Sequence, residues 1–189
     1  MRGLPITNHS EQFEGPVYLL AGLVPEDRLP ALIAEAIEGP SRRVRVHGGD
    51  KTWEERSVSI GGGIWSAMAQ KQVTELACEL MRAPIGKIRA WTNCYAAGER
   101  ISWHKDCAGD IQLLLLLAVA HSPDMSLWLR GRAGPRPFPL TPGDAVLFSA
   151  TRVEHETAAS TDPAPRITAV MRFFALHETG LGFSTPARS

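Results

Sequence analysis

The sequence is poor in cysteine and has no long apolar run. Its three cysteines, Cys78, Cys94 and Cys107, form an odd, unpatterned set rather than a disulfide framework, which favours a reducing compartment. The longest apolar run, 113–120, is too short to span a bilayer. The N-terminus lacks the apolar segment of a signal peptide. We therefore expect a cytoplasmic protein with no membrane partner.

The chain also lacks an excess of charge of either sign. Lys+Arg and Asp+Glu both number 20, so the formal net charge is zero. A strongly basic balance would indicate nucleic acid as a partner, and its absence weakens that class. Dinucleotide fingerprints, phosphate-binding loops and Cys-x-x-Cys pairs are missing as well. These absences favour a small molecule as the partner, with nucleic acid as the alternative. They do not predict an oligomeric state.

The length of 189 residues predicts one domain spanning 1–189. Apolar residues at helical spacing predict helices over 25–38 and 64–82. We expect residues 1–84 to supply helical and strand support together with a substrate region. Residues 85–178 are expected to form the core that carries the functional site.

Strand-like patterns dominate after residue 85, and the order of elements argues against alternating βαβ units. Glycine, proline and arginine at 131–137 predict a turn rather than a strand. The expected fold is mainly β with N-terminal helices (α+β), closed as a sandwich or barrel. The segments expected to be strands are 16–22, 42–47, 57–60, 88–95, 101–106, 111–120, 126–130, 145–148, 154–157 and 167–176.

A His-x-Asp pair, His104 and Asp106, is followed by a distant histidine, His155. Two imidazoles and one carboxylate on one face of the metal are the ligand set of non-haem Fe(II) sites. On an extended segment His104 and Asp106 point to the same face while Lys105 points away. Such pairs often arise by chance, so the weight of this one comes from the residues around it.

From Asn93 to Phe174 the sequence resembles the Fe(II)/2-oxoglutarate-dependent oxygenases. The resemblance is to their AlkB-like or prolyl-hydroxylase-like branch. It is carried by the following features in order: Asn93-x-Tyr95, Gly98, His104-x-Asp106, the stretch LTPGDAVLF at 140–148, His155, Arg166-Ile167-Thr168 and Arg172. The Asn-x-Tyr spacing and the two arginines six residues apart resemble the AlkB-type demethylases in particular.

The resemblance implies a double-stranded β-helix (jelly-roll, cupin-like) core with the metal inside one open end. It implies Fe(II) at His104, Asp106 and His155, 2-oxoglutarate as cosubstrate, O₂, and support by ascorbate. Arg166 would pair with the distal carboxylate of 2-oxoglutarate, since guanidinium is a planar, permanently charged fork.

Other residues near this pattern have assisting or open roles. The hydroxyls of Tyr95 and Thr168 and the amide of Asn93 would assist Arg166 at the cosubstrate. Arg172 has three open roles: a partner for Asp106, a second cosubstrate contact, or a residue of the outer face.

Aromatic and histidine residues outside the pattern have structural roles by default. We expect Trp91, Trp103 and Trp128 to be core residues, with a lining role at the substrate mouth as the alternative for Trp128. The remaining histidines, His9, His47, His121 and His177, are expected to be surface or structural residues rather than ligands. The information on substrate is expected in residues 41–63 and in the loops around Trp103 and Trp128.

The leading function is a dioxygenase that hydroxylates a small molecule or amino-acid-type substrate and releases succinate and CO₂. The neutral charge favours it over an AlkB-like oxidative demethylase of alkylated nucleic acid or protein. A metal-free β-sandwich binding module that kept the fold is the remote alternative.

Overall fold

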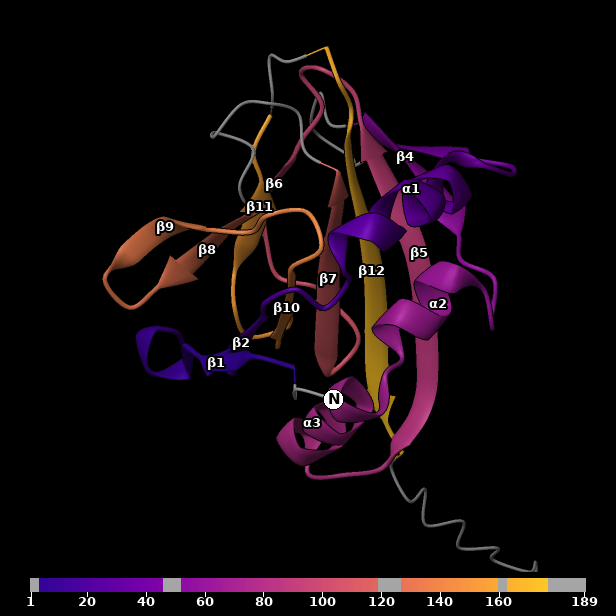
Figure 1. Cartoon of the computed structure of the whole chain (residues 1–189). Helices are drawn as coiled ribbons and strands as arrows, with labels where there is room; N and C mark the ends of the chain where they lie inside the picture. Colours follow the sequence, from indigo (N-terminus) through magenta and orange to yellow (C-terminus); the bar gives the residue numbers. More distant parts are fainter. Residues whose placement is uncertain (1–3, 46–51, 119–126, 160–162, 177–189) are drawn as a thin grey trace, which may run out of the picture.

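The computed structural model describes residues 4–45, 52–118, 127–159 and 163–176, and Figure 1 shows their arrangement. Two antiparallel sheets form the body of the protein, one with eight strands and one with four. The helices lie on the outer face of the larger sheet, in front of β7, β12 and β5 in Figure 1. This is the mainly β jelly-roll core with helical additions that the sequence predicted.

The larger sheet contains, in spatial order, β1 (Ile6–Asn8), β2 (Val17–Leu20), β10 (Ala145–Phe148), β7 (Ile111–Ala118), β12 (Arg166–Ala175), β5 (Ile85–Tyr95), β4 (Thr52–Ser57) and β3 (Arg42–Arg45). The smaller sheet contains β6 (Ile101–His104), β11 (His155–Thr157), β8 (Leu127–Gly131) and β9 (Gly134–Phe138). The helices are α1 (Leu29–Ile37), α2 (Gly63–Met68) and α3 (Lys71–Met81), with 3₁₀ turns η1 (Ser10–Gln12) and η2 (Glu26–Arg28).

The larger sheet is buried on both faces in its centre, and so it separates two apolar cores. In β7, Leu113, Leu115 and Leu117 pack in the core beneath the helices. Leu114 packs in the second core, between the two sheets, together with Phe148 of β10. Successive side chains of a strand point to opposite faces, which explains why the segment reads as a continuous apolar run.

The same alternation on β12 separates core residues from polar ones. The helix side receives Ile167, Ala169, Met171 and Phe173. The intervening positions, which face the space between the sheets, are Arg166, Thr168, Val170 and Arg172. One strand therefore supports the fold with one face and supplies polar groups with the other.

The helix expected at 64–82 is two helices, so that prediction was wrong in its centre. The chain leaves α2 at Ala69, and Gln70 is extended, with φ −59° and ψ 147°. The Gln70 amide donates to the carbonyls of Ala67 at 2.9 Å and Leu23 at 3.2 Å. These bonds hold the break in place, although the apolar spacing continues through it.

Two strand boundaries also differ from expectation. The strand expected at 57–60 lies earlier, as β4, and residues 58–60 follow its end. The turn expected at 131–137 contains β9, which pairs with β8 at the edge of the smaller sheet. The prediction of a turn treated Pro135 and Pro137 as evidence against a strand. It was wrong because proline is tolerated on an edge strand, and β9 is one.

The N-terminal residues are more integrated than their polar composition suggests. Strand β1 pairs with β2, and Phe13 is 1% exposed within the core between the sheets. In the described part of the chain, no helix is long and apolar enough to cross a membrane. His47, His121 and His177 lie outside the described residues.

Candidate active site

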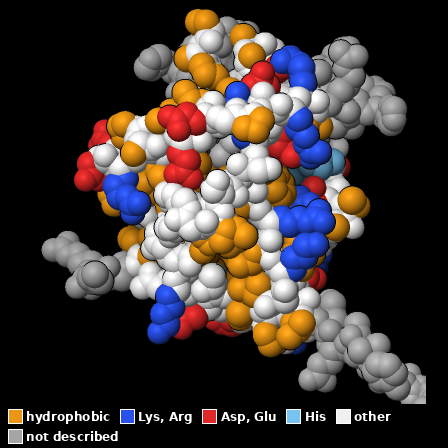
Figure 2. Space-filling model, turned by 90° about the vertical axis from the view of Figure 1, so that its right-hand side faces the viewer, with side chains coloured by type: hydrophobic (Ala, Val, Ile, Leu, Met, Phe, Trp, Pro, Cys, Tyr) orange, Lys and Arg blue, Asp and Glu red, His pale blue; other side chains and the backbone are white. Residues whose placement is uncertain are grey.

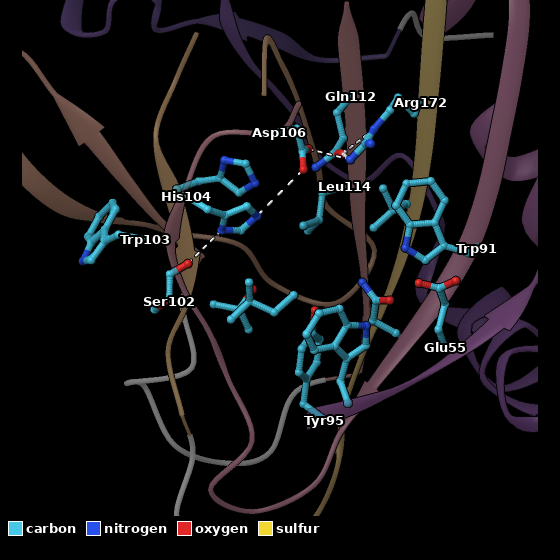
Figure 3. Close-up of a pocket in the computed structure, with 16 residues that line it drawn as sticks. Glu55, Trp91, Tyr95, Ser102, Trp103, His104, Asp106, Gln112, Leu114 and Arg172 are labelled. Carbon is cyan, nitrogen blue, oxygen red and sulfur yellow. Dashed lines mark hydrogen bonds and ion pairs between the residues drawn. The ribbon is translucent and has the colours of Figure 1, made fainter. Parts of the chain in front are cut away.

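The two histidines of the predicted ligand set are direct neighbours across two strands. His155 on β11 pairs in register with His104 on β6. Their ring centroids lie 4.2 Å apart. Residues 51 positions apart in the sequence thus meet because β6 and β11 are adjacent in the smaller sheet; Figure 3 shows His104 beside Asp106 in this site.

Asp106 joins them from the turn that follows β6. Its backbone N–H donates to the carbonyl of Ala150 at 2.9 Å, which fixes the turn. Its Oδ1 lies 3.9 Å from Nε2 of His104. One ligand atom from each of His104, Asp106 and His155 lies within 4.8 Å of the others. Lys105 points away, with its Nζ 3.6 Å from the Glu14 carboxylate, as predicted.

Both imidazole rings are oriented by backbone carbonyls. Nδ1 of His104 lies 2.7 Å from the carbonyl of Ser102, and Nδ1 of His155 lies 3.1 Å from that of Val153. A metal-ligating histidine commonly donates its other ring N–H in this way, which frees Nε2 for the ion. Burial, with the nearby His104, lowers the pKa of His155 to about 3. His155 is therefore neutral, the form that binds metal.

Arg172 takes the first of its three expected roles, as the partner of Asp106. Its Nη2 donates to Oδ2 of Asp106 at 2.5 Å and to Oε1 of Gln112 at 2.8 Å. The guanidinium also lies over the Trp91 ring, 5.1 Å from the centroid. Burial raises the pKa of the Asp106 carboxyl, and the positive charge of Arg172 opposes that rise. The ion pair thus favours the carboxylate form that a metal needs.

Arg166, Thr168, Asn93 and Tyr95 meet across the β5–β12 pair. Arg166 lies opposite Tyr95, and Thr168 lies opposite Asn93. Arg166 is 1% exposed, and its guanidinium lies 5.8 Å from the Tyr95 ring centroid. Burial lowers the pKa of Arg166 to about 10, so it keeps its charge at neutral pH. Burial also raises the pKa of Tyr95 to about 12, so its hydroxyl stays protonated.

Several buried polar atoms of this group have no hydrogen-bond partner in the described structure. They are Nε and Nη1 of Arg166, Oγ1 of Thr168 and Oδ1 of Asn93. An unpaired buried charge is costly, and most buried polar groups find a partner. A bound carboxylate would satisfy the free guanidinium donors and the hydroxyl. These residues therefore fit the distal end of a dicarboxylate.

A cavity of about 390 Å³ lies between the sheets beside the three candidate ligands. We call it the inner cavity. Asn93 and Tyr95 line it, whereas Arg166 and Thr168, directly opposite them on β12, are not among its lining residues. The other lining residues are Trp53, Glu55, Trp91, Ile101, Ser102, Trp103, His104, Asp106, Gln112, Leu114, His155, Thr157, Val170 and Arg172.

The positions of the tryptophans around the inner cavity differ in part from the core positions that the sequence predicted. Trp91 was expected in the core but lines the cavity (Figure 3). Trp103 also borders the cavity, but its ring points away from it in Figure 3, and the Arg130 guanidinium lies 4.8 Å from the ring centroid. Trp128 is partly buried and is not among the lining residues. Trp53, which the sequence did not single out, is 8% exposed and tilts over Tyr95, with ring centroids 6.4 Å apart.

Two polar lining residues were also missed by reasoning from the sequence. Gln112 interrupts an apolar run, and that interruption was a usable indication of a special role. Glu55 lies in β4, where alternation places it and Trp53 on the cavity face of the sheet. No motif marks that segment, so the sequence did not predict that Glu55 and Trp53 line the cavity.

The donor set fits a divalent iron site. Two neutral imidazoles and a carboxylate are the ligands that non-haem Fe(II) prefers, and they leave other coordination positions open. The neighbouring polar group fits a dicarboxylate by its free guanidinium and hydroxyl. Both fits come from the residues themselves.

No protein-family model matches the sequence, and no curated protein matches it by sequence. Solved structures do resemble the fold. A prolyl-4-hydroxylase from Pseudomonas putida superposes with a TM-score of 0.68 at 17% identity, over 85% of this chain and 92% of that chain. The epimerase SnoN from nogalamycin biosynthesis was solved in complex with Fe³⁺, alpha ketoglutarate and nogalamycin RO. It superposes with a TM-score of 0.70 at 13% identity, over 95% of this chain and 88% of that chain.

A third similar structure is an oxidoreductase of the 2OG-Fe(II) oxygenase family from Burkholderia pseudomallei. Its TM-score is 0.66 at 15% identity, over 85% of each chain. At these identities the likeness shows the fold. The chain therefore has the fold of the oxygenases that its second half resembles.

Proposed function

We propose that this protein is an Fe(II)- and 2-oxoglutarate-dependent dioxygenase that hydroxylates a small molecule or amino-acid-type substrate. One observation carries the proposal. A facial set of two histidines and a carboxylate lies in the same inter-sheet space as a buried, unpaired arginine. Either feature alone has a structural explanation, but together they match the two binding requirements of this chemistry.

His104, Asp106 and His155 would hold the metal. Bound Fe(II) would supply O₂ activation coupled to the decarboxylation of 2-oxoglutarate to succinate and CO₂, with ascorbate in support. Arg166 would bind the distal carboxylate, assisted by Thr168, Tyr95 and Asn93. Arg172 would hold Asp106 in its ionised, correctly rotated form.

The size and walls of the inner cavity support a compact substrate. Its volume of about 390 Å³ is within the range of small-molecule sites. Trp53 and Trp91 supply apolar surface that excludes water, and Glu55 supplies an acceptor. Hydrophobic walls with a few placed polar groups are typical of sites that orient small ligands.

An AlkB-like oxidative demethylase is the second candidate. The spacing of Asn93-x-Tyr95 and of Arg166 and Arg172 favours it. The β3–β4 hairpin does not, because two of its arginines are neutralised: Arg42 pairs with Glu55, and Arg43 pairs with Glu99. Nucleic-acid binding needs net positive charge, so hydroxylation of a small molecule is preferred.

The proposed function is tested by succinate formation. Purified protein with Fe(II), ascorbate and 2-oxoglutarate should release succinate above the metal-only background, slowly, even without a primary substrate. His104→Ala should abolish metal binding and succinate release. Lys105→Ala is the matched control, because Lys105 lies next to His104 but points to Glu14, and it should retain both. Wild-type protein that binds neither Fe(II) nor 2-oxoglutarate would sink the proposal.

The cosubstrate assignment is tested with Arg166→Ala. Loss of a buried charged partner should raise the half-saturating 2-oxoglutarate concentration by about tenfold or more, since charge-assisted hydrogen bonds contribute about 1.5–3 kcal/mol. An unchanged requirement would show that Arg166 is not the anchor. The substrate class is decided by comparing an amino-acid library with a methylated oligonucleotide for stimulated succinate release.

A further inference from the structure

A second hollow, on the molecular surface, adjoins the inner cavity. It has a volume of about 510 Å³, and we call it the outer groove. Glu55, Trp91 and Arg172 line both spaces, so the two meet along these three side chains. The candidate metal ligands therefore lie on one side of these three side chains, and the outer groove lies on the other.

The outer groove exists because β4 ends before its neighbour does. Ser57 is the last β4 residue paired with β5, opposite Trp91, and Val58 N–H then donates to the Ala90 carbonyl at 3.3 Å. Residues 85–89 of β5 extend beyond that end, with β12 on their other side. The hollow lies beside this stretch.

The lining of the outer groove combines an apolar group of side chains with charged and polar ones. Val58, Ile60, Trp65 and Ile88 line it, and Ile60 is 83% exposed. Figure 2 shows this side of the molecule, where apolar side chains gather in the middle of the face beside Lys and Arg side chains. An apolar ligand seated in the groove would cover this exposed isoleucine together with Val58, Trp65 and Ile88.

The charges of the outer groove do not balance. Arg42 pairs with Glu55, and Arg172 pairs with Asp106. Among the charged residues described along this groove, Arg89 is the one without a carboxylate partner; its guanidinium lies 5.9 Å from the centroid of the Phe174 ring. Arg89 also lies directly opposite Arg172 on the neighbouring strand. Like charges directly opposite each other are unfavourable, and a bound anion would relieve them.

We propose that the primary substrate is an elongated, amphipathic small molecule with an anionic end. Its reacting end lies in the inner cavity, its apolar body passes Trp91 into the outer groove, and its carboxylate or phosphate meets Arg89. The inference rests on the proposed function for the identity of the reacting end. The groove and its unbalanced cation stand independently of it.

A simpler role for Arg89 is protection of an exposed strand edge, because cations there discourage edge-to-edge pairing. Lys87 separates the two explanations. It lies on the same strand two residues away, and its Nζ also lies over the Phe174 ring, at 6.0 Å. It is not among the residues lining the outer groove. Edge protection needs both cations equally, whereas ligand binding needs Arg89 alone.

The test is direct binding, measured by calorimetry and tryptophan fluorescence with Mn(II) and 2-oxoglutarate present and O₂ excluded. The probes are octanoate, octyl phosphate and octanol, with butyrate as the short control. Octanoate or octyl phosphate should bind about fivefold more tightly than octanol, as expected for one partly exposed ion pair. Butyrate should bind more weakly than octanoate.

Arg89→Gln should remove the preference for the anionic probes, and Lys87→Gln should preserve it. Ile60→Ser should weaken octanoate and octanol alike by about threefold, since it removes apolar surface. Equal binding of anion and alcohol by the wild type, or equal effects of the two cation variants, would overturn the inference.

Succinate release by the wild type, measured in parallel, tests the proposed function separately. If the protein releases succinate but binds the anionic probes no better than octanol, only the proposal for the outer groove is refuted. If it prefers the anionic probes but neither releases succinate nor binds metal, only the proposed oxygenase function is refuted.

Discussion

Asp106 divides its two carboxylate oxygens between two partners. Oδ1 faces His104 and stays available for an ion, while Oδ2 accepts from Arg172 at 2.5 Å. Arg172 is fixed in turn by Gln112 and by the face of Trp91. A single side chain on β12 therefore sets both the charge and the rotation of the carboxylate ligand.

Arg172→Leu should weaken Fe(II) binding by about 10–100-fold, the usual effect of removing the partner of a metal ligand. The reason is that Asp106 loses the charge that favours its ionised form. Anaerobic calorimetry with Fe(II) measures the change. Arg136→Leu, on β9 over the Phe13 ring, is the control and should bind metal like the wild type. Unchanged metal affinity in Arg172→Leu would contradict this role.

Tyr95→Phe should raise the half-saturating 2-oxoglutarate concentration by about five- to tenfold and leave metal affinity unchanged. The hydroxyl is a buried donor that stays protonated, and one hydrogen bond contributes about 1 kcal/mol. Succinate release against 2-oxoglutarate concentration gives the answer. The chain has two tyrosines, so Tyr18→Phe on β2 is a matched control. Equal effects in both variants would rule out a cosubstrate role for the Tyr95 hydroxyl.

At the scale of elements, one face of β12 packs in the core and the other face carries polar side chains of the candidate site. Met171 is fully buried under the helices, whereas Thr168 faces the inter-sheet space with an unpaired hydroxyl. Cavities in a packed core are costly, but loss of an unsatisfied hydroxyl is not. Mutations at neighbouring positions should therefore affect different properties of the protein.

Met171→Ala should lower the free energy of unfolding by about 2–5 kcal/mol. Thr168→Val should change it by less than about 1 kcal/mol, or raise it slightly, while weakening 2-oxoglutarate binding. Urea denaturation without ligand, followed by a 2-oxoglutarate titration, separates the two effects. If Thr168→Val were as destabilising as Met171→Ala, its hydroxyl would have a structural role instead.

At the scale of the whole molecule, the metal and the cosubstrate should stabilise the fold together. Each at about 100 times its dissociation constant adds about 2.7 kcal/mol, or roughly 5–10 °C in Tm for a chain of this size. Thermal unfolding with Mn(II), with 2-oxoglutarate, and with both tests this. Arg166→Ala should keep the Mn(II) shift and lose the 2-oxoglutarate shift. A full 2-oxoglutarate shift in that variant would exclude the proposed anchor.

The mainly β fold class and the His104–Asp106 pair were predictable from strand alternation and ligand chemistry, which are local properties of the sequence. The meeting of this pair with His155 was expected from the resemblance to the oxygenases, because it depends on the pairing of β6 with β11. The choice among the three roles open to Arg172 was not predictable, since the pair with Asp106 depends on how the two sheets face each other. Trp53 and Glu55 were missed for a related reason. They become pocket residues only because β4 pairs with β5 beside Asn93. Contacts set by strand pairing cannot be read from composition or periodicity.

The alternation on β12 also constrains how this protein can change during evolution. A one-residue insertion between Arg166 and Arg172 would move every later side chain to the other face, so Arg172 would point into the helix-side core and Phe173 into the pocket. Metal binding and folding would fail together. Divergence to new substrates is therefore expected through substitutions on the pocket face and through changes in the β3–β4 hairpin. Insertions and deletions within β12 should not be tolerated.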